Sequence, residues 1–110
     1  MIDIEKAKDE IVKSLLPLNP NKIILFGSYA NNTANEDSDI DLFIIKDDID
    51  DFVDFEIDAR RYLRNFILNS DTNGVDILSA TNEYLKKRND YFYQDILKNG
   101  KVLYERNISS

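Results

Sequence analysis

Apolar side chains recur every three or four positions between residues 2 and 16, which predicts an amphipathic helix that ends at Pro17. Two continuous apolar runs follow at residues 22–26 and 39–46, and runs of this length are typical of strands buried on both faces. Helical spacing returns over residues 49–68. The first part of the chain therefore predicts a helix, two strands and a second helix.

The second part of the chain continues this alternation. Asn73-Gly74 is a turn signal, and residues 75–78 are a short apolar run that predicts a third strand. A helix is expected over residues 82–98, with Gly100 in the left-handed conformation that closes many helices. Residues 101–104 are a candidate edge strand.

The order of these elements favours the α/β (α+β) class, with a small mixed sheet flanked by helices. With 110 residues the chain has a common single-domain size, so one domain over residues 1–110 is expected. Apolar residues make up 43% and charged residues 32%, a balance typical of globular proteins in water. No apolar run approaches the length that crosses a bilayer and no export signal is visible, so we expect a cytoplasmic protein without a membrane partner.

The charge balance narrows the chemistry further. The formal net charge is −7, whereas a protein that grips nucleic acid through its phosphates is expected to be basic, so direct nucleic-acid binding is not expected. The sequence has no histidine and no cysteine, which removes the usual general base, the usual zinc ligands and disulfides. Carboxylates and hydroxyls remain as reactive groups, and a divalent cation would allow them to handle a polyphosphate.

Two aspartates interrupt the second apolar run. Because side chains alternate along a strand, Asp39 and Asp41 are expected on one face, roughly 6.6 Å apart along the chain. Carboxylates at this spacing repel each other unless a cation lies between them, and Mg²⁺ prefers one or two carboxylates together with phosphate oxygens. The alternative is that Asp39 caps the start of the strand and Asp41 faces water.

A Gly-Ser pair directly follows the first apolar run. Gly27 would let backbone N–H groups approach a phosphate closely, and Ser28 adds a hydroxyl donor. A short helix that begins at Ser28 would also direct its positive dipole end at the phosphate. The alternative is an ordinary turn at the end of a strand.

A third carboxylate lies in the next apolar run. Asp76 is placed between two apolar residues, just as Asp41 is, and a lone buried carboxylate is costly unless it is paired or bound to a metal. A third strand beside the second would bring Asp76 to the face that carries Asp39 and Asp41. The alternative is a carboxylate in water at a sheet edge.

Together these motifs resemble the nucleotidyltransferase superfamily that includes DNA polymerase beta. The family pattern is a Gly-Ser turn, an Asp-x-Asp strand and a later carboxylate, which this chain supplies as Gly27-Ser28, Asp39-Ile40-Asp41 and Asp76. The segments GSYA, SDIDL, VDIL and KNGKVLYE are similar to the minimal nucleotidyltransferases, or MNT-domain proteins, which include antitoxins of the MntA type. Members commonly carry a glycine where this chain has Asn32, and asparagine is among the residues that best tolerate a positive φ.

The resemblance implies a polymerase beta-like nucleotidyltransferase fold and a role for each residue. Gly27 and Ser28 would be nucleotide-binding and would hold the terminal phosphates of ATP. Asp39 and Asp41 would bind Mg²⁺, and Asp76 would help bind a second Mg²⁺ ion or act as a base, so these three are the expected catalytic and metal-binding residues. The implied reaction is an in-line attack of an acceptor hydroxyl on the α-phosphorus.

The resemblance also implies a partner. Many minimal nucleotidyltransferases are paired with a HEPN-domain RNase in a type VII-like toxin–antitoxin system, in which the antitoxin transfers AMP from ATP to a tyrosine hydroxyl of the toxin. Two alternatives stay open: transfer of a nucleotide to a small molecule such as an aminoglycoside, and a non-catalytic module that inhibits the toxin by contact alone. A homo-oligomer also remains open.

The aromatic content is high for such a small chain, with six Tyr and six Phe. Most of these aromatic residues lie within residues 52–66 and 84–93, and together they are more than one small core must hold. Some of them are therefore candidates for a partner surface. The alternative is a wide core with the tyrosine hydroxyls in water.

Overall fold

The computed structural model describes residues 2–88 and 90–106, and its centre is a four-stranded sheet in the order β3-β2-β1-β4. β1 (Lys22–Phe26) pairs antiparallel with β2 (Ile40–Ile45) on one side and with β4 (Lys101–Glu105) on the other. β3 (Val75–Ala80) runs parallel to β2. The expected mixed sheet is confirmed, and so is the edge strand that follows Gly100.

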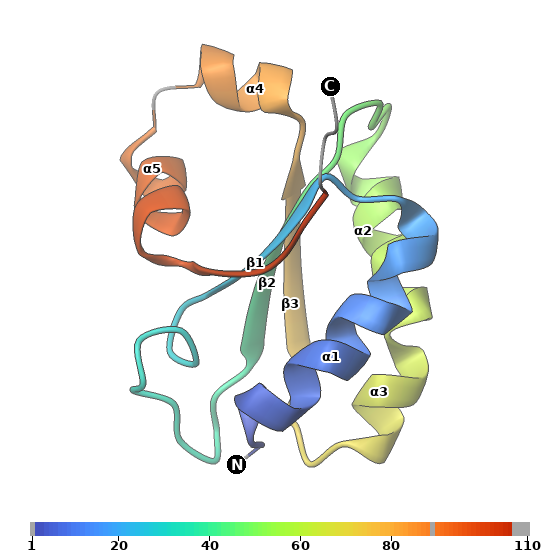
Figure 1. Cartoon of the computed structure of the whole chain (residues 1–110), viewed down its shortest axis with the longest axis vertical. Coiled ribbons are helices and arrows are strands. Elements are labelled where there is room, and N and C mark those ends of the chain that lie inside the picture. Colours follow the sequence, from blue (N-terminus) through green and yellow to red (C-terminus); the bar gives the residue numbers. More distant parts are fainter. Residues whose placement is uncertain (1, 89, 107–110) are drawn as a thin grey trace.

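Helices cover both faces of this sheet (Figure 1). One face carries α1 (Ile4–Leu15), α2 (Phe52–Tyr62) and α3 (Arg64–Asn69), and a short 3₁₀ turn, η1 (Leu16–Leu18), follows α1. The other face carries α4 (Asn82–Lys87) and α5 (Tyr91–Asn99). Among the described residues, no helix is long and apolar enough to cross a membrane.

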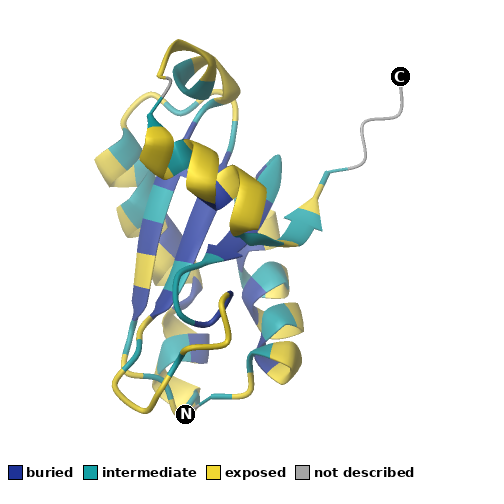
Figure 2. Ribbon diagram, turned by 90° about the vertical axis from the view of Figure 1, so that its left-hand side faces the viewer, coloured by how far each residue is buried: buried dark blue, intermediate teal, exposed yellow. Residues whose placement is uncertain are grey.

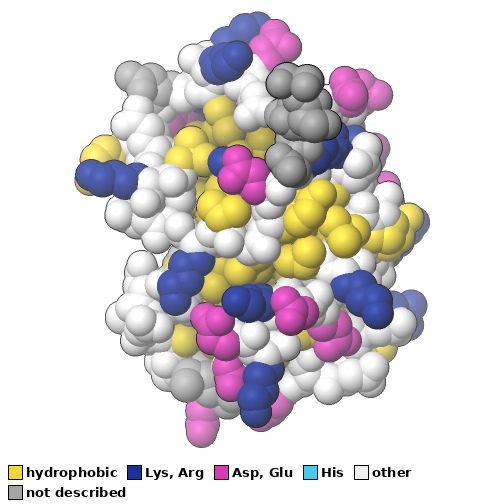
Figure 3. All heavy atoms as spheres, in the orientation of Figure 1, with side chains coloured by type: hydrophobic (Ala, Val, Ile, Leu, Met, Phe, Trp, Pro, Cys, Tyr) yellow, Lys and Arg dark blue, Asp and Glu magenta, His cyan; other side chains and the backbone are white. Residues whose placement is uncertain are grey.

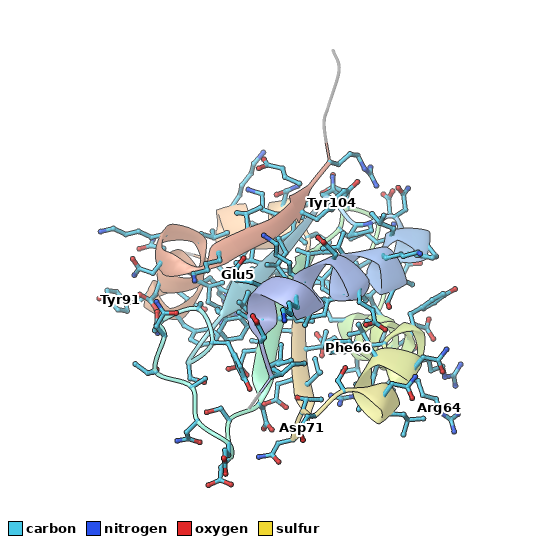
Figure 4. The ribbon with its side chains drawn as sticks, turned by 60° about the horizontal axis from the view of Figure 1, so that its bottom comes forward. Glu5, Arg64, Phe66, Asp71, Tyr91 and Tyr104 are labelled. Carbon is cyan, nitrogen blue, oxygen red and sulfur yellow. The ribbon has the colours of Figure 1, made fainter. Side chains whose placement is uncertain are left out.

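Alternate residues of the strands feed two cores. Ile40, Leu42 and Ile44 of β2 pack on the side of α1, α2 and α3, where Phe66 points inward (Figure 4). Phe43 and Ile45 of β2 face the opposite side, where they pack with Ile24 of β1 and Ile96 of α5. The sheet is therefore buried between the helices, whose outer sides are exposed (Figure 2). This double burial explains why the strands appear in the sequence as continuous apolar runs.

The helix expected over residues 49–68 begins later and is broken once. Residues 47–51 stay in a loop because the Asp51 side chain accepts a hydrogen bond from the Asp54 N–H, 3.1 Å away, and caps α2 there. At Leu63 the backbone turns (φ −87°, ψ −1°), and α3 starts at the next residue. This turn allows both α2 and α3 to pack against α1.

The helix expected over residues 82–98 is also divided, into α4 and α5. Arg88 has an extended backbone, and its guanidinium donates two hydrogen bonds to Asp90 while lying 5.5 Å from the centre of the Tyr84 ring. The expected left-handed Gly100 is wrong, because its φ is −70°. Glycine is required there for space, since a Cβ would lie 2.5 Å from both Ile24 Cγ2 and the Ile96 carbonyl oxygen.

Several aromatic rings contact one another around α4 and α5, and one of them, Phe52, comes from the start of α2. The Phe52 and Tyr84 ring centres are 5.2 Å apart, and Tyr93 lies 5.8 Å from Phe43 and 6.0 Å from Tyr84. In contrast, Tyr91 is 85% exposed. The aromatic side chains are thus divided between the buried layer under α4 and α5 and the exposed surface.

The face seen in Figure 3 carries apolar side chains across its middle, with charged side chains around them. The edge strand β4 crosses this face in Figure 1, and its Val102 is exposed.

Candidate active site

The bend after β1 lies directly against a carboxylate. Gly27 has φ +75°, which L side chains rarely adopt, and a Cβ at this position would lie 2.2 Å from Asp41 Oδ2. The preceding residue, Phe26, pairs with Asp41 across the antiparallel β1 and β2. Glycine is therefore needed here for both its backbone freedom and its lack of a side chain.

A series of tight turns continues the bend. The Ala30 and Asn31 N–H groups both donate to the Gly27 carbonyl at 3.1 Å, and the Thr33 N–H donates to the Ser28 carbonyl at 2.9 Å. The short helix expected to begin at Ser28 does not form, because these bonds close separate turns and not a continuing helix.

Two residues anchor these turns to the body of the protein. Tyr29 and Ala30 are buried, with exposed fractions of 5% and 8%, and they belong to the core under α1. Asn32 has φ +59°, a left-handed conformation that asparagine tolerates better than most residues. The loop after Gly27 therefore keeps a fixed shape beside the sheet.

Three carboxylates meet at the same end of the sheet. Asp41 and Asp76 are direct partners in the parallel register of β2 and β3. Asp39 lies one residue before β2 and not in it, and a Cβ on Gly74 would lie 3.3 Å from Asp39 Oδ1. Asp39 and Asp76 are exposed and Asp41 is partly buried, so all three carboxylates remain accessible.

The electrostatics of Asp41 reflect this arrangement. Partial burial raises the pKa of the Asp41 carboxyl above its usual value, and the negative charges of Asp76 and then Asp39 raise it further. The charges of Asp76 and Asp39 therefore act on the Asp41 carboxyl, which indicates that the three aspartates belong to one site.

The donor set suits a hard divalent cation, because it consists of carboxylate oxygens alone. Within residues 2–88 and 90–106, no three Asp, Glu, His or Cys side chains are close enough to hold a metal ion by themselves. A magnesium ion bound by one or two of these aspartates would take its other ligands from water and from a phosphorylated ligand, which is the usual pattern for Mg²⁺ in nucleotide sites.

Sequence reasoning missed the contribution of Gly74. It was interpreted only as a turn residue, whereas the structure places its backbone against Asp39, and its carbonyl accepts a hydrogen bond from the Ile40 N–H at 3.0 Å. The pairing of β2 with β3 brings Gly74 to this contact. The sequence offered one signal for it, a glycine directly before a strand that carries a carboxylate.

The comparisons with known proteins agree with this geometry. A model of the polymerase beta nucleotidyltransferase family matches residues 5–109. The chain belongs to this family. The resemblance in the sequence is thereby confirmed, and the protein is a nucleotidyltransferase with the fold of that family.

One similar protein comes from Methanocaldococcus jannaschii and is named as a candidate protein adenylyltransferase. The two sequences are 35% identical over 104 residues, which cover 91% of this nucleotidyltransferase and 97% of the relative.

Two solved structures share the fold. A chain of a toxin–antitoxin crystal structure with AMP-PNP has a TM-score of 0.65 and 28% identity, over 90% of this nucleotidyltransferase and 73% of that chain. A chain of a mutant MntA–HpeT toxin–antitoxin structure has a TM-score of 0.64 and 21% identity over the same shares, and it supports the fold alone.

Proposed function

We propose that this nucleotidyltransferase is a cytoplasmic antitoxin that transfers AMP from ATP to a tyrosine hydroxyl of a HEPN-domain RNase toxin. The observation that carries the proposal is the pairing of Asp41 with Asp76 beside the Gly27 bend. Its support from similar proteins is the name of the Methanocaldococcus jannaschii relative and the toxin–antitoxin structure with AMP-PNP.

Each residue of the site has a role in this proposal. Gly27 and Ser28 hold the terminal phosphates, because the left-handed bend and the serine hydroxyl present donors without an obstructing side chain. Asp39 and Asp41 bind Mg²⁺, and Asp76 orients the acceptor hydroxyl from the neighbouring strand, as a ligand of a second Mg²⁺ ion or as a base. When bound, the metal ions neutralise charge on the attacking and leaving oxygens.

The reaction follows from this placement. The acceptor oxygen attacks the α-phosphorus in line, a new P–O bond forms, and the bond to the β-phosphate breaks. Pyrophosphate leaves, and the proton of the acceptor hydroxyl passes to Asp76 or to water. Positioning and charge neutralisation carry most of this chemistry, so it requires no histidine.

Labelled ATP tests the proposal. The chain, Mg²⁺ and the HEPN-domain partner are incubated with ATP labelled at either the α- or the γ-phosphate, and the protein bands are then counted. The proposal expects the α-label on the partner and no γ-label, and loss of labelling when the acceptor tyrosine of the partner is changed to phenylalanine.

Two other outcomes would contradict the proposal in different ways. Label on an added aminoglycoside, and not on the partner, would assign a small-molecule acceptor. Full neutralisation of the toxin by an Asp39→Asn, Asp41→Asn double variant would assign inhibition by contact alone.

A further inference from the structure

A pocket of about 270 Å³ lies between α5 and the bend after β1. Its lining includes Phe26, Gly27 and Asn31 on one side and Phe92, Asp95 and Asn99 of α5 on the other. In Figure 1 these segments approach each other at the left of the molecule, where the outline in Figure 3 is indented. We call this space the α5 pocket.

The α5 pocket adjoins the candidate active site at Gly27. Gly27 lines the pocket, and the same residue lies against the Asp41 carboxylate. The pocket also lies on the carboxylate face of the sheet, because Asp41 is two residues before Phe43 in β2 and therefore shares the face on which Phe43 packs toward α5. A molecule whose phosphates lie at Gly27 therefore has its remaining part within reach of this pocket.

Two other pockets in the described part of the chain lie elsewhere. One is lined by Ile2, Tyr29 and Ala34, which lie on the α1 side of the sheet. Another is lined by residues 47–50 and by Tyr84, at the opposite end of β2. Neither includes Gly27.

The chemistry of the α5 pocket suits a flat aromatic group with polar edges. Phe26 and Phe92 meet edge to face, with ring centres 6.3 Å apart and an interplanar angle of 89°. Phe92 is nevertheless 53% exposed, so part of its ring remains open to a ligand. The amides of Asn31 and Asn99 supply polar atoms at the rim, and Asn99 is held by a hydrogen bond of 2.6 Å from Nδ2 to Asp95 Oδ1.

We propose that the α5 pocket receives the base of the nucleoside triphosphate, stacked on Phe92. The proposal rests on the proposed function, because the phosphates at Gly27 fix where the base lies. Every base has a π-face that stacks on an aromatic ring, and a purine has the larger face. Phe92 therefore determines the affinity for the nucleoside part and favours a purine over a pyrimidine.

Calorimetric titration in the presence of Mg²⁺ tests this inference with three probes: ATP, CTP and inorganic tripolyphosphate. The parent is expected to bind ATP more tightly than CTP. In Phe92→Ala the affinity for ATP falls roughly tenfold or more, because one stacking contact is lost. The affinity for tripolyphosphate stays unchanged, because this probe has no base. Phe92→Tyr keeps a ring and is expected to keep the affinity for ATP.

Tyr91→Ala is the matched control. It also removes an aromatic ring from the first turn of α5, but Tyr91 is 85% exposed and points away from the protein (Figure 4). This variant is expected to bind ATP as the parent does. Thermal unfolding of all variants shows whether α5 remains folded, and a Phe92→Ala variant that unfolds is replaced by Phe92→Leu, which keeps apolar bulk but removes the ring.

The outcomes separate this inference from the proposed function. If the parent binds ATP and a folded Phe92→Ala or Phe92→Leu variant binds it equally well, the base lies elsewhere and the inference is wrong, while the proposed function stands. If the parent binds neither ATP nor tripolyphosphate, both fail. If ATP and tripolyphosphate binding fall together in Phe92→Ala, the residue supports the phosphate bend and not the base, which also overturns the inference.

Discussion

Carboxylates lie at both ends of β2, but their surroundings differ. The near end is the start of the strand, with Asp39 and Asp41, and the far end is the loop that follows it. At the far end, Asp47 accepts hydrogen bonds from the side chains of Asn21 and Asn82, at 3.3 and 3.1 Å, and Asp51 caps α2. At the near end, Asp41 lies beside Asp76 and Asp39, and its pKa is raised first by partial burial and then by the charges of these two neighbours. Carboxylates at the far end stabilise the fold, whereas those at the near end repel one another.

This difference explains how an acidic protein uses a motif as common as Asp-x-Asp. Acidic side chains that cap helices and accept hydrogen bonds require no ligand. Acidic side chains that face one another at the end of a buried strand gain from a cation. Substitutions at the near end should therefore change mainly the activity, and substitutions at the far end mainly the stability.

The largest contrast is expected between Asp41→Asn and Asp48→Asn. A metal ion contributes several kcal/mol of transition-state stabilisation, so Asp41→Asn should lower AMP transfer by roughly a thousandfold. Asp48→Asn removes the same charge at the far end, and asparagine tolerates the positive φ of 58° at that residue. It should transfer AMP at the parental rate. Comparable losses in both variants would mean that net charge, and not the site, controls the rate.

Gly27→Ala should damage both the fold and the activity. The left-handed backbone costs about 1–2 kcal/mol with a side chain, and the added Cβ would also collide with Asp41. Urea denaturation would show the loss of stability, and labelled ATP the loss of transfer. The matched control for stability alone is Gly74→Ala, whose Cβ meets only the Asp39 side chain, at 3.3 Å, without a left-handed φ, and which should lose less stability than Gly27→Ala. Equal stability of Gly27→Ala and the parent would contradict the account of the bend.

Asp51→Ala tests the stabilising role of the far end. Loss of the cap on α2 should reduce the free energy of unfolding by about 1 kcal/mol without changing AMP transfer. Asp51→Asn should stay within a few tenths of a kcal/mol of the parent, because asparagine caps helices as well as aspartate does. The measurement is again urea denaturation. A loss of stability in Asp51→Asn as large as that in Asp51→Ala would show that the charge of the side chain matters and not its hydrogen bond.

The smallest expected effect is a pH dependence in metal-free protein. Folding raises the pKa of Asp41 above its usual value of 3.8, so the folded state holds this proton more tightly than the unfolded chain. The resulting stability is complete below the usual pKa and is lost as the pH rises through the raised one. Measured in a chelator, Asp41→Asn should therefore gain stability relative to the parent as the pH rises above 3.8 and through the raised pKa. A difference in stability that stays constant with pH would contradict the raised pKa of Asp41.

The sequence predicted the sheet and the near end of β2 well, for a physical reason. Strands buried on both faces must be continuously apolar, so a carboxylate inside such a run is conspicuous, as Asp41 and Asp76 are. The parallel pairing that joins these two residues could not be predicted from the sequence, because the register of a sheet depends on contacts between strands.

The parts that the sequence did not predict depend on tertiary contacts. Helical periodicity crosses residues 63 and 88–90 without interruption, but packing on α1 and the Arg88–Asp90 ion pair divide those helices. Gly100 has the residue type of a helix-closing position, although its real constraint is the nearby Ile24 side chain. The α5 pocket was not predicted either, because its walls come from segments far apart in the chain.

The central claim is that the near-end aspartates bind a divalent cation together with the phosphates of ATP. Electron paramagnetic resonance of Mn²⁺, titrated into the chain with a non-hydrolysable ATP analogue, tests it most directly. The account predicts tight Mn²⁺ binding by the parent only when the nucleotide is present, and strong weakening in Asp41→Asn but not in Asp48→Asn. Mn²⁺ and nucleotide bound by Asp41→Asn as tightly as by the parent would contradict it.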